Sequence, residues 1–162
     1  MPLTLIGGGA RSGKSRYAMA LAEAAGGRLA FLATAQASDQ EMADRIAQHQ
    51  RERHPRFTTF EEPLALAALL DRLDTQYDAI VVDCLTLWLS NRMLAGLEAE
   101  DLTAPRRAEV FLVTNEVGCG IVPENDLARR FRDEHGRLNQ QIAAAADRVI
   151  WMVFGCPLRV KG

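Results

Sequence analysis

Short runs of apolar residues alternate along the chain with longer and more polar segments. Five of these runs are continuous rather than alternating between apolar and polar residues: Leu3 to Ile6, Arg28 to Ala33, Ala79 to Val82, Val110 to Val113 and Val149 to Phe154. Such runs are typical of strands buried on both faces of a parallel sheet. Most intervening segments are long enough to cross over as helices, so the pattern predicts an α/β fold with a mainly parallel sheet and right-handed crossovers.

Four further segments refine this picture. Phe57 to Phe60 alternates between apolar and polar residues, which predicts a short edge strand. Ser38 to Arg53 has apolar residues at helical spacing, and His49 falls on the same helix face. Asp126 to Ala146 ends in a run of small apolar residues and predicts a helix that packs closely on the sheet. Gly96 to Arg107 has the least pattern and is expected to be a surface connection.

Composition places the chain among globular proteins. It has 162 residues, of which 48% are hydrophobic and 25% charged, and we expect a single domain over residues 1–162. The 19 Lys and Arg against 21 Asp and Glu give a formal net charge of −2. Bulk charge therefore does not favour nucleic acid as a partner, and only a local basic patch stays open.

The apolar runs and the cysteines indicate the cellular compartment that we expect for the protein. No apolar run approaches the roughly 18 residues of a membrane span, and the first residues carry no basic region of a signal peptide. The three cysteines, Cys84, Cys119 and Cys156, are widely spaced and odd in number, which argues against a disulfide framework. We therefore expect a cytoplasmic protein with no membrane span.

A glycine-rich string between the first apolar run and the following helical segment carries the clearest chemistry. The residues Gly8, Gly9, Ala10, Arg11, Ser12, Gly13, Lys14 and Ser15 fit the pattern G-x-x-x-x-G-K-[ST]. In such a P-loop the backbone N–H groups point at phosphate oxygens, Lys14 would reach the β- and γ-phosphates, and Ser15 would ligate Mg²⁺. The competing interpretation is a glycine turn that binds nothing.

A carboxylate for the same magnesium ion follows a second apolar run. Asp83 ends the run Ala79 to Val82, where ligands bind in open α/β sheets. Asp83 could equally cap the helix that begins near Leu85, and both roles can coexist. Ser15 and Asp83 are thus the candidate metal ligands, and the fold predicted is a P-loop NTPase-like three-layer fold.

The loop alone does not identify a reaction, because motors, switches, ATPases and kinases share it. The chain is too short for a large second domain and has no recognisable N-K-x-D string for reading guanine. Small-molecule phosphoryl transfer is therefore the leading class of function.

Several strings beyond the loop occur together. They are Ala33-Thr34-Ala35, Glu41 to His49, Asp83 to Thr86, Thr114 to Gly118, Gly120 to Asn125, and Arg137 to Gln140. With G-G-A-R-S-G-K-S they span nearly the whole chain and resemble the bifunctional adenosylcobinamide kinase and adenosylcobinamide-phosphate guanylyltransferase family of cobalamin biosynthesis. The resemblance implies that ATP or GTP phosphorylates adenosylcobinamide, and that GTP then donates GMP to adenosylcobinamide phosphate, giving adenosylcobinamide-GDP and pyrophosphate.

In this resemblance His49 matches the residue that becomes guanylylated. A neutral imidazole offers a nitrogen nucleophile near physiological pH, and a phosphoramidate intermediate would divide one substitution at phosphorus into two easier steps. From spacing alone, a histidine on an apolar helix face is more often a packed core residue. His54 and His135 lie among charged residues, and we expect them to be exposed and without chemistry.

The resemblance carries over further residues to nucleotide binding: Ala33, Thr34, Ala35, Gln50, Arg51, Glu52, Arg53, Glu61 and Asp83. For the arginines near position 53, including Arg56, a solvated helix end is the competing interpretation. Glu116, beside a glycine turn, is a candidate substrate-facing base or second magnesium contact, or else a structural cap on that turn. Cys119 and Cys156 are expected to be packing residues.

Two features depart from the family pattern: the short connection from Gly96 to Arg107, and Glu109 at the entrance of a strand that is usually apolar. The family also implies a homotrimer. Two other functions are kept open, namely a monofunctional P-loop small-molecule kinase with a structural His49, and a nucleotide-gated switch that is not an enzyme.

Overall fold

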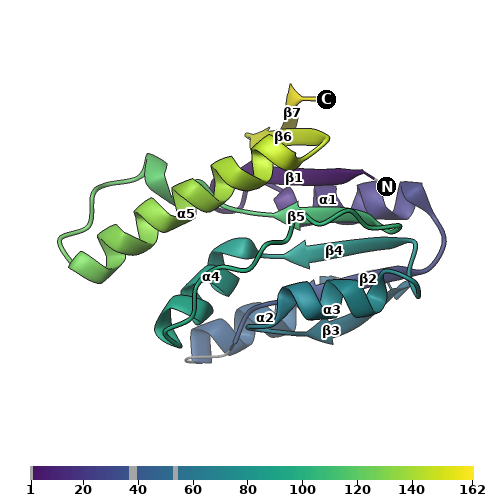
Figure 1. Cartoon of the computed structure of the whole chain (residues 1–162), viewed down its shortest axis with the longest axis horizontal. Coiled ribbons are helices and arrows are strands. Elements are labelled where there is room, and N and C mark those ends of the chain that lie inside the picture. Colours follow the sequence, from purple (N-terminus) through teal and green to yellow (C-terminus); the bar gives the residue numbers. More distant parts are fainter. Residues whose placement is uncertain (1, 37–39, 53–54) are drawn as a thin grey trace.

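The computed structural model describes residues 2–36, 40–52 and 55–162, without the side chains of Arg45, His49 and Glu52. Its centre is a seven-stranded sheet with the order β3-β2-β4-β5-β1-β6-β7 (Figure 1). The strands are β1 (Leu3–Gly8), β2 (Leu29–Ala33), β3 (Phe57–Glu61), β4 (Ala79–Asp83), β5 (Glu109–Val113), β6 (Arg148–Val153) and β7 (Cys156–Lys161). All neighbouring strands pair in parallel except β6 and β7, which form an antiparallel pair.

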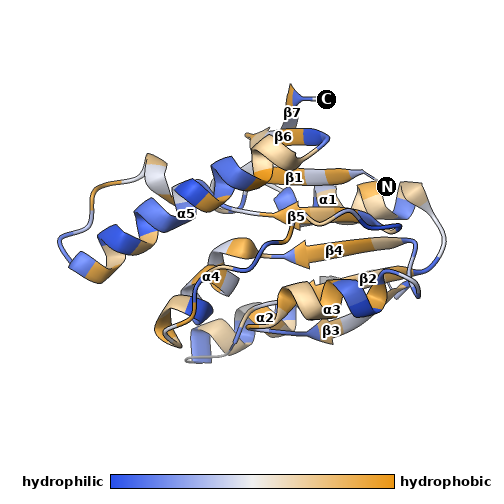
Figure 2. Cartoon of the chain, in the orientation of Figure 1, coloured by the Kyte–Doolittle hydropathy of each residue, from blue (hydrophilic) through white to orange (hydrophobic). Residues whose placement is uncertain are grey.

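Helices cover both faces of this sheet. They are α1 (Lys14–Ala25), α2 (Gln40–Glu52), α3 (Leu66–Leu73), α4 (Leu85–Leu94) and α5 (Asp126–Ala145), with a short 3₁₀ turn, η1 (Val117–Cys119). One core packs α3, α4 and α5 on the sheet, and a second packs α1 on the opposite face. Figure 2 shows the hydrophobic residues concentrated along the central strands, as expected for strands buried on both faces.

This architecture confirms the predicted α/β fold with a mainly parallel sheet. The five apolar runs form β1, β2, β4, β5 and β6, and Phe57 to Phe60 lies in the edge strand β3. The predicted helices appear as α2 and α5, while Ser38 and Arg53, the expected ends of the first, lie outside the described residues. The antiparallel strand β7 was not predicted, because its residues are exposed throughout and leave no buried face to detect.

A half-buried arginine explains how Glu109 is tolerated at the start of β5. The Arg148 guanidinium forms an ion pair with the Glu109 carboxylate and donates to the Thr4 hydroxyl at 3.1 Å. The negative charge of Glu109 at the start of β5 is therefore neutralised by Arg148 at the start of β6.

The connection from Gly96 to Arg107 contains no helix or strand, as predicted, but part of it is buried. Leu102 is 1% exposed and belongs to the core beneath α3, α4 and α5. Arg106 is also buried, donating to the Leu102 carbonyl at 3.0 Å and to the Asp71 carboxylate at 2.8 Å. The expectation of a purely surface connection is thus wrong for Leu102 and Arg106. The sequence did not indicate their burial, because the residues around them are mostly polar.

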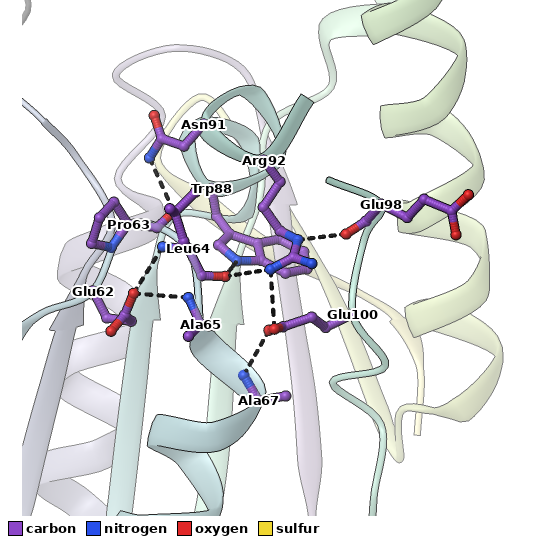
Figure 3. Close-up of polar contacts among 10 residues, drawn as sticks. All are labelled: Glu62, Pro63, Leu64, Ala65, Ala67, Trp88, Asn91, Arg92, Glu98 and Glu100. Atoms are coloured by element: carbon purple, nitrogen blue, oxygen red, sulfur yellow. Dashed lines mark hydrogen bonds and ion pairs between the residues drawn. The ribbon is translucent and has the colours of Figure 1, made fainter. Parts of the chain in front are cut away.

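Arg92 of α4 fastens the same connection to the start of α3 (Figure 3). Its guanidinium donates to the Leu64 carbonyl at 2.8 Å, pairs with the Glu100 carboxylate at 3.0 Å and donates to the Glu98 carbonyl. The other oxygen of Glu100 accepts the Ala67 amide of α3 at 3.0 Å. One arginine therefore links α4 both to the connection that directly follows it and to Leu64, 28 residues away in sequence. In the described residues, no helix is both long enough and apolar enough to cross a membrane.

Candidate active site

The segment Gly8 to Ser15 forms a tight loop between β1 and α1. Gly8 has φ 147°, and a Cβ at this position would lie 2.8 Å from the Met152 carbonyl oxygen of β6. Gly13 has φ 90° and directly precedes α1. Both residues adopt backbone conformations that L side chains rarely adopt, so the glycines are required by the path of the loop.

The N-terminus of α1 is left free to meet an anion. Its first turn contains no acidic residue, and Gly13 offers no capping side chain. The first amides of a helix lack partners within the helix and carry positive potential. A phosphate group fits this end of α1 on both counts.

Lys14 lies inside the loop rather than in solvent. It is 8% exposed, and its ammonium donates to the Gly9 carbonyl and lies 3.4 Å from the Ser12 hydroxyl. Burial lowers the pKa of Lys14, and the nearby Asp83 carboxylate opposes this effect. Lys14 at the start of α1 and Asp83 at the end of β4 therefore lie close enough for their opposite charges to attract.

Ser15 and Asp83 supply the oxygen donors that Mg²⁺ prefers. Both are half-buried, Ser15 in the first turn of α1 and Asp83 at the end of β4. Within the described residues, no group of three His, Cys, Asp or Glu could hold a metal ion. Nucleotide-bound Mg²⁺ needs no such group, because phosphates and water complete its coordination. A hydroxyl and a carboxylate at this edge therefore fit the ion.

Thr34 uses its hydroxyl within the protein. Its Oγ1 donates to the Cys84 carbonyl at 2.7 Å and accepts the Cys84 amide at 2.8 Å. Thr34 is fully buried between Ala33, which is also buried, and the half-buried Ala35. The segment thus fixes the chain directly after Asp83, and nucleotide contact by Ala33, Thr34 and Ala35 stays a prediction.

Two of the predicted nucleotide-binding residues, Gln50 and Glu61, meet at the β3 edge of the sheet. The Gln50 side-chain amide of α2 lies 3.4 Å from the Glu61 carboxylate at the end of β3, and Arg51 is exposed nearby on α2. The side chains of His49 and Glu52, and all of Arg53 and His54, lie outside the described residues. The structure brings Gln50 and Glu61 together, and their role stays a prediction.

Glu116 follows β5 and faces the beginning of the loop. Its Oε1 lies 3.9 Å from the place that a Cβ on Gly7 would occupy, and its other oxygen accepts the Cys119 thiol at 3.9 Å. The carboxylate therefore stands beside β1 where β1 enters the loop. This position is consistent with a substrate-facing base.

A buried polar cluster, which the sequence did not reveal, holds the residue before Glu116. The Asn115 amide donates to the Thr86 hydroxyl oxygen at 3.0 Å, and the Asn115 carbonyl accepts the Asn139 side-chain amide at 3.1 Å. His135 Nε2 lies 2.9 Å from Thr86 Oγ1 and 3.3 Å from Thr114 Oγ1. Elements α4, β5 and α5 thus meet at one histidine.

The hydrogen bonds assign the neutral form of His135. Thr114 has one hydroxyl proton and donates it to the Asn139 side-chain oxygen at 2.7 Å, so the Thr114 oxygen accepts from His135 Nε2. Nε2 therefore carries the proton, and Nδ1 faces the Asn139 NH₂ group at 3.4 Å as an acceptor. Consistently, burial lowers the pKa of His135 to about 4.

Two expectations about side-chain environment are wrong. His135 is 1% exposed rather than exposed, since it shares the inner face of α5 with Leu138 and Ile142. The spacing 135, 138, 139 and 142 could have revealed that face. Cys119 and Cys156 are exposed and do not pack, because they lie in the turn after β5 and in the exposed edge strand β7.

A strand, a glycine loop with an enclosed lysine, and a helix N-terminus on a mainly parallel sheet define a P-loop NTPase-like protein. Its fold resembles that of the flagellar accessory protein FlaH from Methanocaldococcus jannaschii, with a TM-score of 0.53 and 13% identity over 99% of this chain and 78% of that one. At this identity the likeness concerns the fold alone.

The chain belongs to the cobinamide kinase / cobinamide phosphate guanyltransferase family, whose model matches residues 4–160. It is 45% identical to the bifunctional adenosylcobalamin biosynthesis protein CobP of Pseudomonas aeruginosa, over 98% of this chain and 96% of that protein. It is 41% identical to the corresponding protein CobU of Salmonella typhimurium, over 98% and 99% of the two chains. The resemblance inferred from the strings is thereby confirmed.

Proposed function

We propose that this chain catalyses both reactions named by its family. In the first, the hydroxyl of the aminopropanol arm of adenosylcobinamide attacks the γ-phosphorus of a nucleoside triphosphate, giving adenosylcobinamide phosphate and the nucleoside diphosphate. In the second, GMP passes from GTP to that phosphate, and pyrophosphate leaves. The observation that carries the proposal is the enclosed Lys14 in a P-loop of a chain that matches the family over residues 4–160.

Several residues have assigned roles in phosphoryl transfer. The amides of Gly9 to Ser15 and the Lys14 ammonium bind the β- and γ-phosphates and offset their charge. Ser15 and Asp83 would hold Mg²⁺, which supplies charge neutralisation on the phosphate oxygens. Glu116, held beside Gly7, accepts the proton of the attacking hydroxyl.

Guanylyl transfer is assigned to His49. A neutral imidazole nitrogen attacks the α-phosphorus of GTP, the bond to the bridging oxygen breaks, and pyrophosphate departs. The phosphate of adenosylcobinamide phosphate then attacks the same phosphorus, and the bond between phosphorus and histidine breaks. The intermediate is a guanylyl-histidine with a phosphoramidate bond, which acid hydrolyses.

This assignment requires α2 to approach the loop. The contact between Gln50 and Glu61 fixes α2 beside β3, four strands away from β1 in the sheet. At roughly 4.8 Å per strand, about 19 Å separate the ends of β3 and β1. Either α2 moves toward the loop on GTP binding, or α2 of a neighbouring copy meets it. Homotrimeric assembly and a cytoplasmic location stay predictions.

Labelled GTP separates the two reactions and the rival functions. Protein incubated with α-labelled GTP and Mg²⁺ is expected to acquire acid-labile label, and His49→Ala to acquire none while it still transfers γ-label to adenosylcobinamide. His54→Ala serves as the matched histidine control and should label normally. Transfer of γ-label without any covalent label would favour a monofunctional kinase, and absence of both would favour a nucleotide-gated switch.

A further inference from the structure

The turn between β6 and β7 borders the phosphate-binding loop. A Cβ on Gly13 would lie 4.0 Å from Gly155 Cα and 3.7 Å from the terminal carbon of Met152. Gly8 approaches the Met152 carbonyl oxygen of the same strand even more closely. Residues 152–155 therefore border the loop at both Gly8 and Gly13, beside the N-terminus of α1.

Phe154, in this turn, combines almost complete exposure with a left-handed backbone conformation. Its side chain is 98% exposed, whereas the large apolar residues of the central strands are buried. Its φ is 52°, in the left-handed region that glycine or asparagine adopts at lower cost. Neither the turn nor the core gains from a phenylalanine here. Exposed apolar surface and backbone strain together are typical of a position that contacts a ligand.

We propose that Phe154 is the platform on which the purine base of the bound nucleotide stacks. The inference rests on the proposed function, since it requires a nucleotide at Gly8 to Ser15. With the phosphates bound by the amides of that loop, the neighbouring turn offers an exposed aromatic ring on which the base of the same nucleotide can stack. Because every purine has a π-face, stacking serves ATP and GTP alike and does not discriminate between them.

Equilibrium binding of GTP, ATP and inorganic tripolyphosphate, each with Mg²⁺, tests the platform. Phe154→Ala is expected to weaken GTP and ATP about tenfold, the scale of a lost base–aromatic stack, and to leave tripolyphosphate unchanged. Phe154→Tyr should retain nucleotide affinity. Leu158→Ala, which removes another exposed apolar side chain on β7 at 51% exposure, is the control and should bind all three ligands normally.

Other outcomes overturn the proposal. Unchanged GTP affinity in Phe154→Ala would remove the stacking role, as would an equal loss for tripolyphosphate. If sedimentation showed that Phe154→Ala alters self-association while GTP binding is retained, the turn would be a contact between copies of this chain. Lys14→Ala separates the proposed phosphate site from the proposed stacking role of Phe154. Loss of GTP and tripolyphosphate binding in Lys14→Ala would support the phosphate site even if Phe154→Ala bound GTP normally. No binding by the unaltered protein would overturn both.

A tryptophan placed in the turn gives a second readout. In Phe154→Trp, stacking should quench the fluorescence of the new indole when GTP or ATP is added and leave it unchanged with tripolyphosphate. The two native tryptophans, Trp88 and Trp151, provide the background recorded with the unaltered protein. A quench of equal size with tripolyphosphate would contradict stacking.

Discussion

His135 Nε2 lies 2.9 Å from the hydroxyl oxygen of Thr86, and the same hydroxyl oxygen accepts the Asn115 amide at 3.0 Å. His135 of α5 therefore helps to hold Asn115, the residue before Glu116, through a hydroxyl group that both of them contact. A protonated His135 would turn Nδ1–H toward the Asn139 NH₂ group, so that two donors would face each other.

This arrangement predicts a pH-dependent stability. Burial lowers the pKa of His135 to about 4, against about 6.5 in the unfolded chain. Between these values the unfolded state binds a proton that the folded state does not, so stability is full above pH 6.5 and falls as pH decreases toward 4. The loss from this group amounts to about 3 kcal/mol, and below pH 4 it grows no further.

Urea unfolding at pH 7, 5.5 and 4.5 measures this effect. His135→Gln is expected to be less stable at pH 7 but to lose less stability on acidification. Carboxylates that titrate in the same range act on both proteins, so the difference between the two slopes isolates His135. Parallel slopes would show that the imidazole is not held neutral.

Thiol reactivity should divide the three cysteines two to one. Cys84 is buried, and burial raises its pKa to about 11, so its thiolate is scarce at neutral pH. Cys119 and Cys156 are exposed. With an aromatic disulfide reagent, two thiols are expected to react at once and the third only on unfolding. Cys84→Ser should still show two fast-reacting thiols, and Cys119→Ser only one. If Cys84→Ser showed one fast-reacting thiol fewer than the unaltered protein, Cys84 would not be the buried thiol.

Local pattern accounts for most of the fold and for part of the site. Buried strands and the loop from Gly8 to Ser15 could be predicted because their residues are adjacent in sequence and obey a short-range rule. The cluster around His135 could not, because Thr86, Thr114 and Asn139 come from three elements whose packing no local pattern records. The burial of Arg106 was hidden for the same reason, since its partner Asp71 lies 35 residues away.

Arg92 should contribute more to the free energy of unfolding than an exposed arginine does. Its side chain is 11% exposed and pairs with Glu100 while donating to two carbonyls. Arg92→Ala is expected to lower the free energy of unfolding by about 2–3 kcal/mol, because the half-buried Glu100 carboxylate loses its ion pair and the carbonyls of Leu64 and Glu98 lose a donor. Arg92→Lys keeps the charge without the planar fork and should recover only part of the loss.

The matched control for Arg92 is Arg137, whose pair with Glu134 is exposed on α5. Arg137→Ala should change the free energy of unfolding by no more than about 0.5 kcal/mol. Chemical denaturation of the three variants gives the comparison. Equal losses for Arg92→Ala and Arg137→Ala would mean that the contacts of Figure 3 do not hold the connection in place.

Two neighbouring glycines of the loop should respond differently to one added methyl group. In Gly8→Ala the new Cβ would lie 2.8 Å from the Met152 carbonyl oxygen and 2.9 Å from the Ser12 hydroxyl, at φ 147°. In Gly9→Ala it would meet no heavy atom within 4 Å. We expect Gly8→Ala to destabilise the protein by about 2–3 kcal/mol and Gly9→Ala by less than about 1 kcal/mol.

Denaturation combined with tripolyphosphate binding separates packing from phosphate contact in these variants. Gly8→Ala must displace both the Met152 carbonyl of β6 and the Ser12 hydroxyl, or the loop itself, so it should lose phosphate affinity at least about tenfold together with stability. Gly9→Ala keeps the backbone path and the carbonyl that accepts the Lys14 ammonium, and any loss of affinity there reports a steric effect on the anion alone. If Gly8→Ala kept both its stability and its phosphate affinity, the loop would be able to move away from β6 and from the turn that carries Phe154.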